Sequence, residues 1–161
     1  MTHPLIEPRH LQRTAYVYLR QSSPGQVRRN REGHHRQQGM VEHVTTLGWP
    51  RPQIVLLDGD TGQTGSSQHG RVDFQRLLEA IVTGQAGLVA ARELSRLVRD
   101  NQDWAHVVRL CRFEDVLLAD EHRLYNARDA QDRMLLGIQG AFNEFELSLI
   151  VERMQQCLHD K

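Results

Sequence analysis

Residues 15–25 have the sequence AYVYLRQSSPG, an apolar run that gives way to turn-forming residues. Its first five residues are β-prone and apolar at successive positions, which is typical of a strand buried on both faces. The serine, proline and glycine that follow favour a turn. The stretch therefore predicts a buried strand at residues 15–19 with a polar loop at its carboxyl end.

The same alternation of short apolar runs and helical patterns continues along the chain. Further strands are predicted at residues 54–57, 87–91 and 116–119, and helices at 31–47, 74–82 and 104–111. Strands that alternate with helices are joined as parallel strands through helical crossovers. We expect an α/β fold in three layers, with a mostly parallel sheet of four to five strands flanked by helices.

Length and composition favour one folded domain. The chain has 161 residues, of which 39% are hydrophobic and 25% charged, enough for a single core. No apolar run reaches the roughly 18 residues that a membrane helix needs, and no signal-peptide core precedes the first strand, so we expect a cytoplasmic protein. Cys111 and Cys157 lack metal or redox spacing and are expected to be buried free thiols.

The domain is expected to have three parts. Residues 1–13 are predicted to be a flexible leader and residues 14–128 the folded body. Residues 129–161 contain no proline and are predicted to form one long helix. Its apolar residues cover more than one face, which favours contact with another subunit or with a part of the protein beyond this chain.

The charges are balanced in number but not along the chain. There are 20 basic and 20 acidic residues, and the only lysine is Lys161. Residues 9–36 contain seven arginines and one acid, whereas residues 114–132 contain six acids and two arginines. Arginine suits two-pronged contacts to phosphate, so the clustering favours a phosphate-bearing ligand. Base composition of a genome would explain the missing lysines but not this clustering.

The first candidate for chemistry is Ser22. In a strand, Tyr18 and Arg20 face the same way, and Ser22 follows at the mouth of the loop. A hydroxyl beside a guanidinium is suited to attack on phosphorus, because the arginine stabilises the alkoxide and the phosphate oxygens. A serine after a strand can equally be a turn residue.

Further arginines follow the other strands. Arg96 and Arg99 lie three residues apart, directly after the predicted strand at 87–91, and could hold one anion between them. Arg71 follows a loop rich in glycine and serine. In the terminal helix, Glu146 and Glu152 could orient guanidinium groups, with Arg153 next to them, although helix glutamates often only face water.

The ordered set of these motifs resembles the catalytic domain of the serine recombinase (resolvase/invertase) family, particularly its large serine recombinase and transposon-type branch. The resemblance runs from about Ala15 to Met154. Its parts, in chain order, are Tyr18-x-Arg20-x-Ser22, Gln38 in the first helix, Asp58 before the loop with Gly62 and Gly65, Arg71-x-x-Phe74, Leu94-Ser95-Arg96-Leu97-x-Arg99-Asp100, and Glu146 to Arg153.

The resemblance implies site-specific DNA recombination by phosphoryl transfer, with no cofactor, metal or nucleotide. It assigns Ser22 as the nucleophile that becomes joined to a DNA 5′ phosphate. Arg20, Arg71, Arg96 and Arg99 would bind the scissile phosphate. The supporting residues would be Tyr18, Gln38, Asp58, Ser95, Glu146, Glu152 and Arg153. Double-stranded DNA is the implied partner, with a homodimer that becomes a tetramer in the synaptic complex.

Two positions depart from the family pattern. Many relatives have an aspartate at the position of Ser95, so the general acid and base stay unassigned. Leu147 stands where relatives often have an arginine. The family also continues into DNA-binding domains that these residues do not include, and the neutral net charge predicts weak binding of this piece to nonspecific DNA.

Other classes of function remain as alternatives. A noncatalytic assembly module with the same fold would not need Ser22. A magnesium-dependent phosphatase of the haloacid dehalogenase type is suggested by residues 54–61, but Gly62 and the lack of a downstream lysine before Lys161 disagree with that motif. A metal site at His34, His35 and His43 lacks convincing partner ligands.

Overall fold

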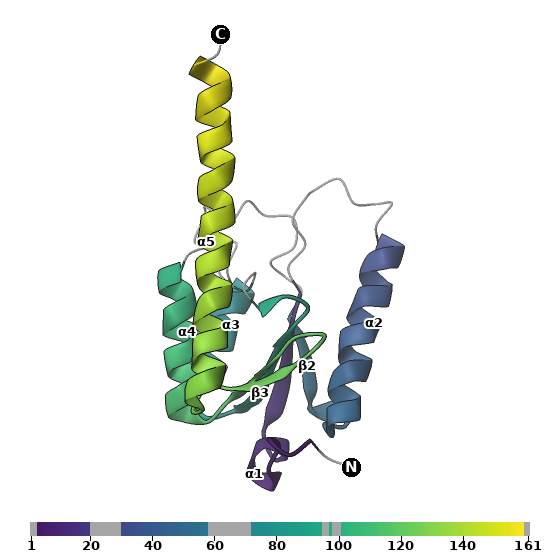
Figure 1. The fold of residues 1–161 in the computed structure, drawn as a ribbon. Coiled ribbons are helices and arrows are strands. Elements are labelled where there is room, and N and C mark those ends of the chain that lie inside the picture. Colours follow the sequence, from purple (N-terminus) through teal and green to yellow (C-terminus); the bar gives the residue numbers. More distant parts are fainter. Residues whose placement is uncertain (1–2, 20–29, 58–71, 95–96, 98–100, 160–161) are drawn as a thin grey trace.

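The sheet of this chain has five strands in the order β2-β1-β3-β4-β5 (Figure 1). The computed structural model describes residues 3–19, 30–57, 72–94, 97 and 101–159, apart from the side chains of residues 30–37, 101, 142–148, 150, 151 and 159. The strands are β1 (Thr14–Tyr18), β2 (Ile54–Leu57), β3 (Ala86–Ala91), β4 (Leu117–Ala119) and β5 (Leu124–Asn126). The described helices are α1 (Pro8–Leu11), α2 (Asn30–Leu47), α3 (Val72–Val82), α4 (Asn101–Glu114) and α5 (Ala130–His159), with a 3-10 turn, η1, at Arg51–Gln53.

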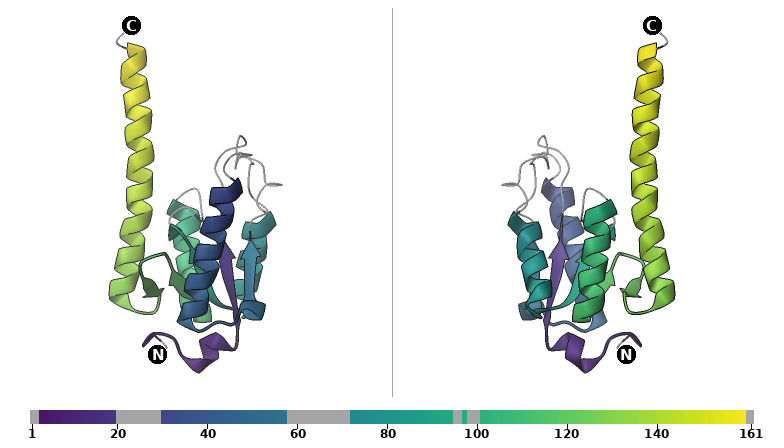
Figure 2. Two further views of the ribbon diagram at one scale, coloured as in Figure 1. Left: turned by 90° about the vertical axis from the view of Figure 1, so that its right-hand side faces the viewer. Right: turned by 90° about the vertical axis from the view of Figure 1, so that its left-hand side faces the viewer.

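Helices cover both faces of the sheet, which gives the three-layer α/β fold that the sequence predicts (Figures 1 and 2). Successive residues of β1 face opposite layers. Val17 packs in a core with Met40 and Val44 of α2. Tyr18 packs in a second core, to which α3, α4 and α5 contribute residues. The two cores explain why the strands are apolar at successive positions rather than at alternate ones.

The antiparallel strand β5 is the one strand for which the sequence predicts no separate segment. It spans three residues and follows a tight turn. Asp120 holds that turn, because its Oδ1 accepts hydrogen bonds from the backbone N–H groups of His122, at 2.8 Å, and Arg123, at 2.7 Å. The short length leaves no alternating pattern to detect, although a fifth strand lies within the predicted range of four to five.

The expectation of a flexible leader at residues 1–13 needs correction for residues 3–13, which we call the N-terminal segment. This segment contains α1 and packs at the amino end of the sheet, with Ile6 and His10 buried. Ile6 joins the core formed with α2. Gly87 of β3 permits the close approach, because a Cβ atom there would lie 2.3 Å from the carbonyl oxygen of His10.

Asp115, between α4 and β4, binds the N-terminal segment from the other side. Its Oδ2 accepts a hydrogen bond from Arg9 Nε, and its Oδ1 lies 3.3 Å from Nε2 of His10. Among the described residues, neither Oδ1 of Asp115 nor Nε2 of His10 has a partner in good hydrogen-bond geometry. Burial would raise the pKa of Asp115, but the contacts with Arg9 and His10 and the charge of Arg128 outweigh it and lower that pKa.

Helix α5 begins on the body and ends beyond it. Leu136 is buried, and its carbonyl accepts a 2.7 Å hydrogen bond from Nε1 of Trp104 on α4. Residues 152–158 are all exposed, and the C-terminal part of the helix projects from the body (yellow in Figure 2). No helix within the described ranges is both long and apolar enough to cross a membrane.

The two cysteines differ in their surroundings. Both are free; Cys111 is buried in the core, where burial raises the pKa of its thiol to about 12, whereas Cys157 is exposed on α5. The expectation that both are buried is therefore wrong for Cys157, which lies on the part of the helix that the body does not cover.

Replacement of Gly87 by alanine should destabilise the domain. The added Cβ would collide with the backbone of the N-terminal segment, and a backbone atom cannot move aside as easily as a side-chain end. We expect a loss of about 1–3 kcal/mol in the free energy of unfolding, measured by urea denaturation.

Gly137→Ala is the matched control, because a Cβ at this exposed position of α5 meets nothing within 4 Å. This control should raise stability by about 0.5–1 kcal/mol. Equal stability of Gly87→Ala and the wild type would contradict the close approach.

Low pH should remove the contribution of Asp115 to the free energy of unfolding. Because the folded-state pKa of Asp115 lies below its ordinary value of 3.8, the contribution is present above pH 3.8 and is lost as the pH falls through the folded-state value. Asp115→Asn should therefore be less stable than the wild type at neutral pH, and the gap should narrow below pH 3.8.

The measurement is urea denaturation over a pH series, with Glu42→Gln on the exposed side of α2 as a control for removal of one charge. A gap that stays constant down to strongly acidic pH would show that the charge of Asp115 does not stabilise the fold.

Candidate active site at the carboxyl edge of the sheet

Three adjacent parallel strands end at the same level. Tyr18, the last residue of β1, pairs with Leu57, the last residue of β2, and with Ala91, the last residue of β3. The backbone N–H of Leu19 donates a 2.9 Å hydrogen bond to the carbonyl of Leu57, which extends the alignment by one residue. The segments that follow the three strands in the sequence therefore start from one edge of the sheet.

Most candidate residues belong to these following segments. Those that lie outside the described residues are Arg20, Ser22, Asp58, Arg71, Ser95, Arg96 and Arg99. The structure does describe the residues that precede or follow them, and these fix where each segment attaches to the body.

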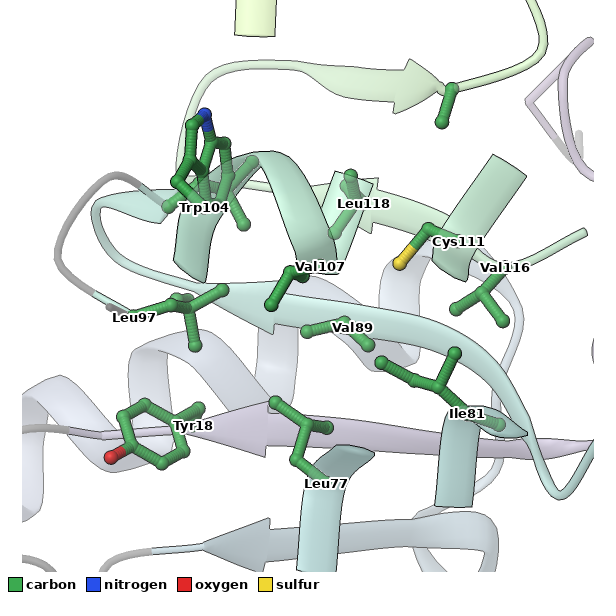
Figure 3. Packing of buried hydrophobic residues seen from close by; sticks show 14 of the residues in the cluster. Tyr18, Leu77, Ile81, Val89, Leu97, Trp104, Val107, Cys111, Val116 and Leu118 are labelled. Atoms are coloured by element: carbon green, nitrogen blue, oxygen red, sulfur yellow. The ribbon is translucent and has the colours of Figure 1, made fainter. Parts of the chain in front are cut away.

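The attachment residues share one hydrophobic core. Tyr18 lies four positions before Ser22, and Leu57 directly precedes Asp58. The remaining members, on the first turn of α3 and after β3, are Phe74, Leu94 and Leu97. All five are at most 5% exposed, and Figure 3 shows Tyr18 and Leu97 at the same end of this core.

Leu94 and Leu97 anchor their segment in the core. The sequence places them in a motif but does not predict this role. These residues flank Ser95 and Arg96, and they are 1% and 2% exposed. Apolar residues three apart on either side of a polar pair were the available signal. Their burial attaches the chain to the core directly before Ser95 and directly after Arg96.

Tyr18 is the predicted supporting residue with the best-defined surroundings. It is 5% exposed and packs in the core on the side of α3 and α4. Tyrosine here supplies a rigid ring that fills the end of the core and a polar hydroxyl. Tyr18 is thus placed to support the segment that begins two residues later.

The other described candidates lie farther out. Gln38 is exposed on α2, the helix that covers the opposite face of the sheet from α4. Glu146 lies within α5, and Glu152 and Arg153 are exposed on the part of that helix that projects past the carboxyl edge (Figure 1). Of these residues, Gln38, Glu152 and Arg153 have exposed side chains.

The described residues of the carboxyl edge are held in place by strand pairing and by burial. Within the described ranges, no three His, Cys, Asp or Glu side chains are grouped so that they could hold a metal ion. Paired backbone and buried anchor residues fix the strand ends. Side chains on the following segments can therefore be brought to one region with little loss of conformational entropy.

One known protein family matches most of this chain. The sequence matches the family described as "Resolvase, N terminal domain" over residues 15–161. A curated relative, the "Uncharacterized protein y4bA/y4pH" of Sinorhizobium fredii (strain NBRC 101917 / NGR234), is 37% identical over 156 residues, which cover 97% of this chain. The chain spans 22% of the length of that relative.

Two solved structures share the fold. A resolvase family site-specific recombinase from Streptococcus pneumoniae is 23% identical, with a TM-score of 0.59 over 92% of this chain and 97% of the other. The N-terminal catalytic domain of TP901-1 integrase is 24% identical, with a TM-score of 0.54 over 85% of this chain and 98% of the other.

Proposed function

Because the chain belongs to the resolvase family, as a serine recombinase catalytic domain, we propose that it cuts and rejoins DNA with Ser22 as the nucleophile. The supporting observation is the common edge, because the residues that attach the three candidate-bearing segments, which include Tyr18 and Leu57, share one core. The order of the motifs along the chain assigns the roles.

The proposed reaction is phosphoryl transfer between two oxygen atoms. The Ser22 oxygen attacks the phosphorus of a phosphodiester, a P–O bond to serine forms, and the bond from phosphorus to the 3′ oxygen breaks. Serine gives up its proton, and the leaving 3′ oxygen gains one. The product is a 5′-phosphoserine that retains the energy of the broken bond, so a 3′ hydroxyl can reverse the attack and rejoin the strand.

The arginines would bind the phosphate through this exchange. Arg20, Arg71, Arg96 and Arg99 present fixed donors to the nonbridging oxygens, whose charge redistributes in the transition state. With Ser95 in place of an aspartate, an arginine or water is left to deliver the proton to the leaving oxygen.

The supporting residues divide by distance from the edge. Tyr18 is itself an attachment residue, Asp58 and Ser95 directly follow attachment residues in the sequence, and these three would orient the nucleophile and the arginines. Gln38, Glu146, Glu152 and Arg153 are on helices and would act once DNA or another subunit covers them.

Double-stranded DNA and further copies of the chain are the proposed partners. The projecting part of α5 carries Met154 and Leu158, which are 65% and 78% exposed. Apolar side chains on an uncovered helix favour burial against a partner. We assign this part to a homodimer that pairs into a tetramer during strand exchange, within a protein longer than these residues.

Replacement of Ser22 by alanine should abolish covalent attachment to DNA. The test uses the chain joined to its native downstream sequence and a nicked suicide substrate, with the adduct resolved on a denaturing gel. Ser23→Ala is the matched control and should still form the adduct. An adduct with Ser22→Ala, or none with the folded, DNA-bound wild type, would favour a noncatalytic assembly module.

Replacement of Arg96 by alanine should slow cleavage by about 10²–10³-fold, as expected for loss of one donor to a developing negative charge. The control is Arg51→Ala, because Arg51 is exposed on η1, which directly precedes β2 and so lies at the opposite, amino edge of the sheet. Single-turnover cleavage of saturating DNA measures both rates. Equal rates for the two variants would remove Arg96 from the site.

A further inference from the structure

Asp115 connects two parts of the chain that are far apart in sequence. On one side it contacts Arg9 and His10 of the N-terminal segment. On the other side, Nε of Arg128 lies 3.7 Å from its Oδ1. Arg128 is two residues before the first residue of α5. One buried carboxylate thus lies between the N-terminal segment and the base of α5.

Further contacts make this connection stiff. Nε of Arg128 also donates a 3.1 Å hydrogen bond to the carbonyl of Arg112 at the end of α4. On the side of the N-terminal segment, Arg13 donates a 2.9 Å hydrogen bond to the carbonyl of Glu114. The carbonyl of Arg13 in turn accepts a 3.1 Å hydrogen bond from Nε1 of Trp49. The segment is therefore held to the end of α4 at two adjacent positions.

The backbone conformation at Asp115 is one that glycine adopts more easily, so the choice of aspartate needs an explanation from its side chain. Its φ is +56°, the left-handed conformation in which helices often end with glycine. The backbone N–H of Val116 donates a 2.9 Å hydrogen bond to the carbonyl of Cys111, so the turn itself is an ordinary helix ending. Glycine would form this turn without strain, and an aspartate there is explained by the ion contacts that it makes.

A residue of the first turn of α5 also stabilises the turn that precedes this helix. Oδ2 of the buried Asp132 accepts a 2.9 Å hydrogen bond from the backbone N–H of Asn126, and its Oδ1 lies 3.0 Å from Arg123. Arg128 is therefore part of a turn that is fixed to the first turn of α5. A displacement of Arg128 would also displace the first turn of this helix.

We propose that the N-terminal segment is a strap that fixes the direction of α5 through Asp115. The strap lies before residues 15–161, the part that matches the family. An α-helix of 30 residues is about 45 Å long, so a tilt of about 10° at its base moves its far end by about 8 Å. A firm base therefore sets where the projecting part of α5 meets a partner. This inference does not depend on the chemistry of Ser22.

Hydrogen exchange followed by mass spectrometry tests the strap in the full chain. In Arg9→Ala and Asp115→Asn, amide exchange in residues 126–136 should rise about tenfold and by a larger factor than in β1 and β3, because the base of α5 loses its support while the strands follow only the change in global stability. Arg9 is 49% exposed, so its removal leaves no cavity in the core.

Arg92→Ala is the matched control, with 45% exposure and an ion pair to Glu121, and should leave exchange in residues 126–136 unchanged. Asp115→Gly separates side chain from backbone: the strap predicts faster exchange at the base of α5 even though glycine relieves the left-handed turn. Wild-type protection of residues 126–136 in Asp115→Gly, or faster exchange confined to residues 3–13 in Arg9→Ala, would overturn the proposal. An equal rise in residues 126–136, β1 and β3, which a loss of global stability alone would give, would overturn it too.

Discussion

The level ending of three parallel strands is the constraint on which the rest of the structure depends. Tyr18 is paired with Leu57 on one side and with Ala91 on the other, so β1 sets the register of both neighbours. Parallel register places three carboxyl ends at one edge, and the segments with the candidate residues begin there. A slip by one residue in β1 would exchange its two buried faces and lose both cores, which is why the register is firmly set.

The sequence predicted those elements whose burial leaves a periodic pattern. Continuous apolar runs marked β1 to β4, and apolar residues at helical spacing marked α2 to α5. The N-terminal segment was missed because it is polar: His10 is buried beside Asp115, a residue more than 100 positions away, and no local pattern reports such a contact. Three-residue β5 was missed because it is too short to show a period.

The candidate site was predicted in a different way. Motif order assigned roles to Ser22 and the arginines, and these assignments rest on family resemblance rather than on periodicity. The attachment of the segments follows from burial, which the sequence indicated for Tyr18 and Leu57 but not for the pair Leu94 and Leu97. The geometry of the polar side chains depends on contacts between separate segments, and a linear pattern cannot specify those contacts.

The body, the carboxyl edge of the sheet and α5 are connected by packing and ion contacts. The proposed chemistry lies at the strand ends, and the proposed partner contacts lie on a helix that is fixed at its base. A crystal structure of the chain with bound vanadate or tungstate, a tetrahedral oxyanion like phosphate, tests the central claim most directly. We expect one anion within hydrogen-bond distance, about 3 Å, of the Ser22 hydroxyl and of guanidinium groups from Arg20, Arg71, Arg96 and Arg99. An anion-bound structure with Arg96 and Arg99 on the opposite side of the sheet from Ser22 would contradict it.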